Sequence, residues 1–289
     1  MACGQLKIHA QPKLSDARMI LAFSGWMDGG NVSTGTVEWL GQTLEARKVA
    51  EIDPENFYIY SFPGSMEVSA RFRPRTKIED GLISAFQPPE NTFFCAEQHE
   101  LVLFHGREPN FNWSEFADCI FSFASEAGVS SLYFVGSVGA AVPHTREPRL
   151  MSSVSDKRLK PTLERFGITF TDYSGPASFS THLLAHARSR GFRMASLVAE
   201  IPAYIQGTNP KSIEAVIKKL AAILHIEVDL REVRKLSAAW EERLNEVLEQ
   251  KEDLAKYIRK LEEDYDNEVF DTQMGDLKDW LEQQGIRVD

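Results

Sequence analysis

Short, continuous apolar runs alternate along this chain with segments of helical periodicity. The apolar runs are Met19–Ser24, Phe57–Ser61, Leu101–His105, Leu132–Val135 and Met194–Ile201. The helical segments are Asn31–Val49, Phe111–Ala127, Pro161–Phe166, Ser178–Arg190 and Pro210–Ile226. Strands without polar alternation are buried on both faces, and strands alternating with helices are typical of α/β proteins. The pattern predicts an α/β fold with a mostly parallel central sheet and helices on both faces. The extended stretch Glu67–Ile83, interrupted by Gly81, could add an antiparallel piece.

The last part of the chain follows a different pattern. No Gly or Pro interrupts Asp229–Tyr265, and apolar residues recur there at intervals of seven: Val233, Trp240, Val247, Leu254 and Leu261. This spacing predicts one long amphipathic helix with a coiled-coil-like stripe. A linker at Asn267–Met274 and a short helix at Asp276–Gln284 are expected to follow. The stripe packs either on its own chain or between subunits. We therefore expect an α/β core over residues 1–228 and an acidic helical extension over 229–289.

Charge and composition exclude several classes of function. The net charge is −10, and residues 229–289 hold 18 acidic and 10 basic side chains, which leaves −2 for the rest. Binding to phosphate backbones or anionic membranes needs a basic surface, so neither nucleic acid nor membrane is an expected partner. No apolar run approaches the roughly 20 residues of a membrane span, and the first residues lack a secretory signal. Cys3, Cys95 and Cys119 show no metal-site or disulfide spacing, which indicates a cytoplasmic protein.

An unusual loop follows each apolar strand. If the strands are parallel, these loops share the carboxyl edge of the sheet, where open α/β sheets bind ligands. The residues there that could contact a ligand are Gly25, Trp26, Asp28, Gly29, Gly30, Asn31, Glu108, Gly136, Gly139, His144 and Arg146. Glycines let the backbone turn sharply and expose N–H groups, and His and Arg could hold an anion.

Each of these features also has a purely structural interpretation. Asp28 or Asn31 can cap the following helix, and His144 can hydrogen-bond a neighbouring group. The basic cluster Arg71, Arg73 and Arg75 could be a solvated strand edge or an anion site. No nucleophile elbow, HExxH, CxxC or kinase-like motif is present, so we predict no catalytic residue, metal or cofactor.

Six short segments of the chain lie in the order seen in the proteasome assembly chaperone 2 family, which the chain resembles. They are Ala22–Gly30, Arg71–Pro74, Gly106–Pro109, Pro143–Arg146, Gly175–Pro176 and Ile201–Tyr204. The resemblance implies an α/β domain of nucleoside-phosphorylase-like architecture with a helical C-terminal extension. Eukaryotic members help proteasome α-subunits assemble through protein contact, without known catalytic chemistry. The chain is more similar to the prokaryotic branch, whose members are largely of unassigned function and often homo-oligomeric.

Two functions are therefore expected as alternatives. The first is a non-enzymatic, self-associating protein that acts like an assembly chaperone. The second is an enzyme or small-ligand binder that holds a nucleoside- or phosphate-containing ligand at the carboxyl-edge loops. In the second case Asp28, Asn31, Glu108, His144 and Arg146 would line one pocket.

Overall fold

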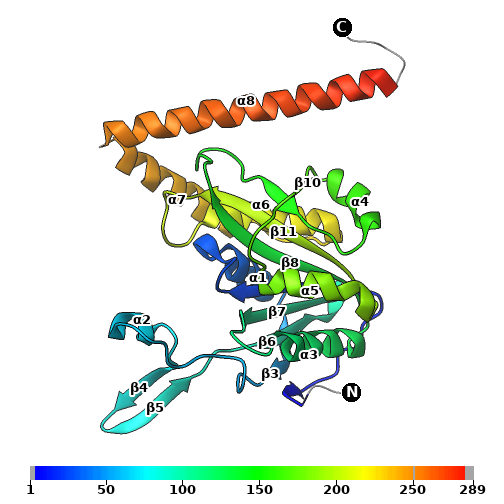
Figure 1. The fold of residues 1–289 in the computed structure, drawn as a ribbon, viewed down its shortest axis with the longest axis vertical. Helices are drawn as coiled ribbons and strands as arrows, with labels where there is room; N and C mark the ends of the chain where they lie inside the picture. Colours follow the sequence, from blue (N-terminus) through cyan, green and yellow to red (C-terminus); the bar gives the residue numbers. More distant parts are fainter. Residues whose placement is uncertain (1–3, 250, 284–289) are drawn as a thin grey trace.

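The computed structural model describes residues 4–249 and 251–283. A nine-stranded sheet forms the centre of this part of the chain, in the order β1-β3-β6-β7-β2-β8-β11-β9-β10 (Figure 1). Its strands are β1 (Leu6–Ile8), β2 (Ala17–Ser24), β3 (Arg47–Ile52), β6 (Thr92–Ala96), β7 (Leu101–Arg107), β8 (Val129–Ala140), β9 (Leu150–Ser152), β10 (Thr169–Phe170) and β11 (Arg193–Pro202). The α/β fold class predicted from the sequence is confirmed.

The middle of the sheet is parallel and its flanks are mixed. β2 pairs in parallel with β7 and β8, and β8 pairs in parallel with β11. The pairs β1–β3, β3–β6, β6–β7 and β9–β11 are antiparallel. All four middle strands contain predicted apolar runs, because strands covered on both faces need apolar side chains on both.

Helices cover both faces of the sheet. They are α1 (Val32–Thr43), α3 (Trp113–Glu126), α4 (Lys160–Glu164), α5 (Phe179–Ala187) and α6 (Pro210–Leu224). Phe116 of α3 and Phe179 of α5 pack with Phe23 on one face, in a cluster of buried aromatic rings. α1 and α6 cover the other face, in a second cluster that contains Val32 and Ile217. The described residues also form 3-10 turns at Gly29–Asn31, Glu97–His99, Lys157–Leu159 and Arg188–Arg190.

Two predicted elements in the first third of the chain are wrong. The helix expected to reach Val49 ends at Thr43, and β3 begins at Arg47. Between them Glu45 adopts a φ of +50°, which a helix cannot accommodate. The strand predicted at Phe57–Ser61 is absent, because Phe57 is buried from a loop, with its ring 4.9 Å from that of Phe116.

The C-terminal prediction also needs correction. The single helix expected over Asp229–Tyr265 is two helices, α7 (Arg231–Glu249) and α8 (Glu252–Gln283), which meet at an angle (Figure 1). The linker expected at Asn267–Met274 is helical, since α8 continues through it. Gln284, the end of the predicted short helix, lies outside the described residues.

A small arm projects from the body between β3 and β6. It consists of α2 (Met66–Ala70) and a separate two-stranded sheet of β4 (Arg75–Glu79) and β5 (Leu82–Gln87). Figure 1 shows this β4–β5 hairpin reaching away from the central sheet. The strands are antiparallel and turn at Gly81, which adopts a φ of +79°. The antiparallel piece anticipated around Glu67–Ile83 is therefore present, although its first part is the short helix α2.

Cys95 is a free, buried thiol, whereas Cys119 on α3 is disulfide-bonded, so the expectation of no disulfide is corrected. Across residues 4–249 and 251–283, none of the helices combines the length and the apolar character that crossing a membrane requires.

Candidate functional site

The loops after the parallel strands meet at one edge of the sheet. β2 ends at Ser24 and β7 at Arg107, and the two loops touch where Trp26 N–H donates to Glu108 Oε2 at 3.0 Å. The Gly25–Asn31 loop also contacts β8, because Ser137 N–H donates to the Met27 carbonyl at 2.8 Å. These contacts follow from the shared direction of the middle strands, which the alternating pattern had predicted.

Gly30 shows why the first loop needs glycine. Its φ is +63°, a conformation that residues with a Cβ rarely adopt. A Cβ at Gly30 would lie 2.9 Å from Asn209 Cβ, and one at Gly29 would lie 2.8 Å from Ile201 Cδ1. Gly29 therefore serves close packing of the loop against the end of β11, and Gly30 serves close packing against the segment after it.

The polar side chains of this loop make structural contacts. The carboxylate of Asp28 accepts from Thr34 N–H at 3.1 Å and from Thr34 Oγ1 at 2.8 Å, which fixes the first turn of α1. Burial raises the pKa of Asp28, and the Thr34 hydrogen bonds oppose that rise. Asn31 Nδ2 donates to Thr208 Oγ1 at 2.9 Å. The helix-capping interpretation thus applies to Asp28. Asn31 instead connects the loop to the chain before α6.

Glu108 joins three segments. Its Oε2 accepts from Trp26 N–H, and its Oε1 accepts from Phe179 N–H at 2.8 Å. Phe179 is the first residue of α5, whose N-cap is Ser178. A carboxylate at a helix N-terminus is stabilised by the orphan N–H groups and the helix dipole. Glu108 therefore fastens the Gly25 loop and α5 to the end of β7.

The two glycines of β8 lie next to different neighbours. A Cβ at Gly136 would lie 2.7 Å from the Phe134 ring, and one at Gly139 would lie 3.5 Å from Ala203 Cβ. Gly136 thus makes room for a core aromatic ring, and Gly139 lies in ordinary contact with the chain after β11.

His144 and Arg146 belong to a separate group of contacts with the C-terminal helices. His144 is 2% exposed, with Nδ1 2.9 Å from Tyr204 Oη and Nε2 3.2 Å from Asn245 Oδ1 on α7. Arg146 donates from Nε and Nη2 to the two carboxylate oxygens of Asp266 on α8, at 2.8 and 2.7 Å. The turn after β8 is thereby a docking point for α7 and α8.

The predicted stripe on these helices is partly covered by the same chain. Val233 and Leu261 are buried, and Trp240 lies with its ring 6.2 Å from that of His144. Val247 is 45% exposed and Leu254 is half-buried. Part of the stripe thus packs within the chain, and its middle reaches the surface.

His144 should make stability depend on pH. Burial lowers its pKa, although the hydrogen bond to Asn245 opposes the shift. Below a pH of about 6.5 the unfolded chain takes up this proton more readily than the folded one, so the free energy of unfolding should fall as the pH drops. Urea unfolding at pH 7.5 and 5.5 should show a smaller difference in His144→Gln than in the wild type. Equal differences in both proteins would contradict this role.

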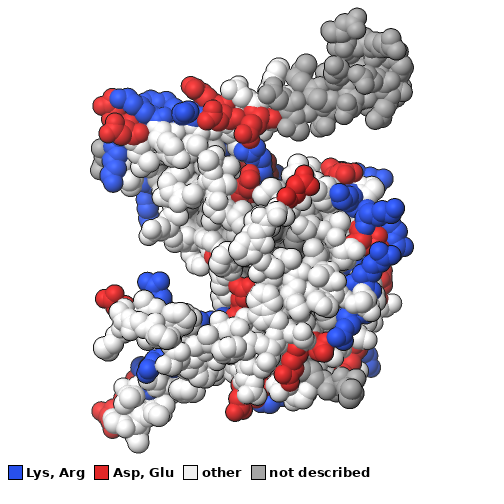
Figure 2. Space-filling view, in the orientation of Figure 1, with Lys and Arg blue, Asp and Glu red and all other residues white. Residues whose placement is uncertain are grey.

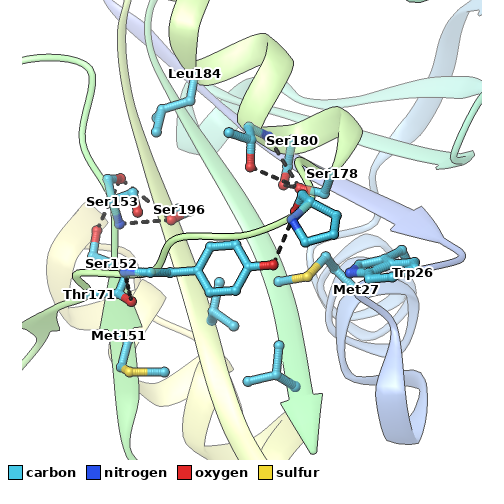
Figure 3. Close-up of a pocket in the computed structure, with 15 residues that line it drawn as sticks. Trp26, Met27, Met151, Ser152, Ser153, Thr171, Ser178, Ser180, Leu184 and Ser196 are labelled. Atoms are coloured by element: carbon cyan, nitrogen blue, oxygen red, sulfur yellow. Dashed lines mark hydrogen bonds between the residues drawn. The ribbon is translucent and has the colours of Figure 1, made fainter.

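A cavity of about 280 Å³ lies on the α5 side of the same edge. Five serines line it: Ser152, Ser153, Ser178, Ser180 and Ser196. Thr171 and Thr181 add two hydroxyls, and Trp26, Met27 and Met151 add apolar surface (Figure 3). Of the eleven predicted ligand residues only Trp26 lines this cavity. Sequence reasoning missed the serines because they come from separate segments, and the pair Ser152–Ser153 carries no motif.

The predicted residues thus fall into two groups. The Gly25–Asn31 loop, Glu108, Gly136 and Gly139 surround the ends of β2, β7 and β8, whereas His144 and Arg146 line a small hollow beside α7. A cluster of three or more side chains able to bind a metal does not occur among the described residues.

The sequence and the fold are similar to those of known proteins. Residues 22–248 match the model of the PAC2 family. A protein of unknown function from Mycobacterium tuberculosis shares the fold, with a TM-score of 0.81, 19% identity and coverage of 95% of this chain and 92% of the other.

Two further solved structures are also similar. A PAC2 family protein from Streptomyces avermitilis aligns with a TM-score of 0.72, 25% identity and coverage of 84% and 100%. A proteasome-assembly chaperone homologue from Mycobacterium tuberculosis aligns with a TM-score of 0.72, 26% identity and coverage of 83% and 99%. No curated protein matches the sequence. Since the family model spans most of the chain and takes in the parallel strands, their loops and α7, this protein belongs to the PAC2 family.

Proposed function

We propose that this protein is a non-enzymatic, assembly-chaperone-like protein that self-associates and acts through protein contact. The observation that carries the proposal is the exposed apolar face of the arm. Ile78 pairs with Ile83 and Thr76 with Phe86, so these side chains share one face of the hairpin. Ile78, Ile83 and Phe86 are 61%, 70% and 62% exposed.

Such a surface needs a partner. A lone two-stranded hairpin is marginally stable in water, and contiguous exposed apolar surface usually marks an interaction site. Figure 2 shows much of the arm surface in white in this view, with charged side chains on α2, near the tip of the hairpin and at the root. We infer that the apolar face of the arm, defined by Ile78, Ile83 and Phe86, is covered by another protein molecule.

Charge favours a second copy of the same chain as that molecule. Arg71, Arg73 and Arg75 line a hollow at the root of the arm together with Arg107. Residues 229–289 carry a net charge of −8 (10 basic minus 18 acidic side chains). Opposite charges across an interface steer association and set its register. The arm of one copy therefore suits the acidic C-terminal region of the next.

The similar proteasome-assembly chaperone homologue supports action through protein contact. The contacts of Asp28, Glu108 and Arg146 support it as well, because their polar groups are already satisfied within the chain. A catalytic role would need groups that are available to a substrate.

Light scattering after size exclusion tests the proposal directly. The wild type at micromolar concentration should exceed the 32.6 kDa of one chain. In the double variant Ile83→Glu/Phe86→Glu, the dissociation constant of the oligomer should rise roughly 100-fold, because the interface would bury unpaired charges. Each factor of ten in that constant corresponds to about 1.4 kcal/mol.

Leu82→Glu is the matched control. Leu82 is 74% exposed on the same hairpin, but it pairs with Glu79 on the opposite face. The mass of the Leu82→Glu variant in solution should stay at the wild-type value. A monomeric wild type, or an equal effect of both changes, would refute self-association through the apolar face of the arm.

A further inference from the structure

The serine-lined cavity lies where the large apolar side chains of the core are followed by smaller and more polar ones. On the α5 face of the sheet, Phe134 and Met194 belong to the packed core, but Val138 and Val198, four residues further along β8 and β11, form the cavity wall. The hydroxyl of Ser196 lies between Met194 and Val198 on the same strand face. Smaller and more polar side chains thus open a space between the sheet and the start of α5.

The cavity offers hydrogen bonds without charge. Its described lining contains no Asp, Glu, Lys, Arg or His. Ser178 Oγ and Ser180 Oγ lie 2.7 Å apart on one side, and Ser196 Oγ accepts from Ser153 N–H at 2.9 Å on the other (Figure 3). A hydroxyl donates once and accepts twice, so Ser180 Oγ and Ser196 Oγ each retain capacity for a ligand. Ser178 Oγ is already filled by Ser180 Oγ, Thr181 Oγ1 and Thr181 N–H.

An anion is disfavoured at this place. The N-terminus of α5 would ordinarily attract one, but Glu108 Oε1 already accepts from Phe179 N–H. A phosphate bound at Ser178 or Ser180 would face that carboxylate, and no lining cation would compensate it. The charge arrangement therefore selects an uncharged ligand.

The remaining walls favour a flat ring. Trp26 and Tyr173 line the cavity and are 70% and 67% exposed, so their rings are available for stacking. The thioethers of Met27 and Met151 add polarisable surface that suits aromatic rings. The volume of about 280 Å³ is near the lower limit, about 300 Å³, of small-molecule sites.

We propose that this cavity binds an uncharged heteroaromatic compound that carries hydroxyl groups, of the size and chemistry of a nucleoside. Its ring lies against Trp26 and Tyr173, and its hydroxyls bind the serines of α5 and β11. The site is separate from the arm, so it adds a small-molecule ligand to a protein that acts by protein contact.

Calorimetric titration with matched pairs tests the proposal. The full chain is titrated with adenosine, guanosine and uridine and with their 5′-monophosphates. At least one nucleoside should bind, and its monophosphate should bind about tenfold or more weakly. Binding of a monophosphate as tightly as its nucleoside, or no binding of any nucleoside at about 5 mM, would overturn the proposal.

Variants then locate the site. Ser153→Phe should fill the cavity and weaken binding by about tenfold or more; the Ser153 side chain has no described hydrogen bond to lose. Ser15→Phe makes the same change at an exposed serine outside the cavity and should leave binding unchanged. Trp26→Ala, at an exposed side chain, should weaken binding about fivefold or more, because stacking contributes about 1–3 kcal/mol per base. Unchanged binding in Ser153→Phe and Trp26→Ala would show that the nucleoside binds elsewhere.

Discussion

Phe116→Ala should lower the free energy of unfolding by about 3–5 kcal/mol, the usual loss for a fully buried Phe. The Phe116 ring is 0% exposed, and it joins α3 to the sheet and to α5. Its centroid lies 4.9 Å from that of Phe57, 5.4 Å from Phe179 and 6.4 Å from Phe23. Removing it leaves a cavity that the surrounding rings cannot fill by small movements. Urea unfolding followed by circular dichroism measures the loss.

Phe111→Ala is the matched control for that experiment. Phe111 precedes α3 and is 51% exposed, so its loss should cost less than about 1 kcal/mol. A loss below about 1.5 kcal/mol in Phe116→Ala would show that the ring cluster does not hold the two layers together.

Glu108→Ala should lower the free energy of unfolding by about 2–4 kcal/mol. It removes the acceptor of two backbone N–H groups, those of Trp26 and Phe179, and hydrogen bonds to a charged partner contribute about 1.5–3 kcal/mol each. Because Glu108 is half-buried, water should recover part of the loss. Hydrogen exchange should also accelerate at these two amides, which distinguishes loss of the Glu108 hydrogen bonds from general destabilisation.

Glu108→Gln and Glu126→Ala are the controls. The Gln side chain keeps one acceptor oxygen, so roughly half of the loss should return. Glu126 is exposed at the end of α3, and its removal should change the free energy of unfolding by less than about 0.5 kcal/mol. If Glu108→Ala left both the stability and the exchange of Trp26 and Phe179 unchanged, Glu108 would not join the segments.

The central strands were the most predictable part of the fold. Met19–Ser24 and Met194–Ile201 read as strands because parallel strands in the middle of a sheet are apolar on both faces. β3 was missed because Arg47, Lys48, Ala50 and Glu51, four of the six residues in its sequence RKVAEI, form helices well and continue the pattern of the preceding helix. Only the pairing with β1 and β6 makes this segment a strand, and tertiary pairing is not visible in a local pattern.

The candidate site was predictable in position but not in side-chain contacts. Parallel strands require their loops to share an edge, and Trp26 and Glu108 indeed meet there. Whether a carboxylate faces a ligand or a backbone N–H depends on a distant segment, as Phe179 shows for Glu108. The break between α7 and α8 has no sequence signal either, since the seven-residue spacing runs from Val247 to Leu254 without interruption.

On the ribosome, β2 emerges long before its neighbours in the sheet. It opens at residue 17, whereas β7 opens at 101 and β8 at 129, which are separations of 84 and 112 residues. At about 5–20 residues per second, the chain needs roughly 6–22 s to add 112 residues. During that time the apolar run Met19–Phe23 lacks at least one of its two partners. Aggregation of the nascent protein should therefore be governed by how this first central strand is shielded during translation.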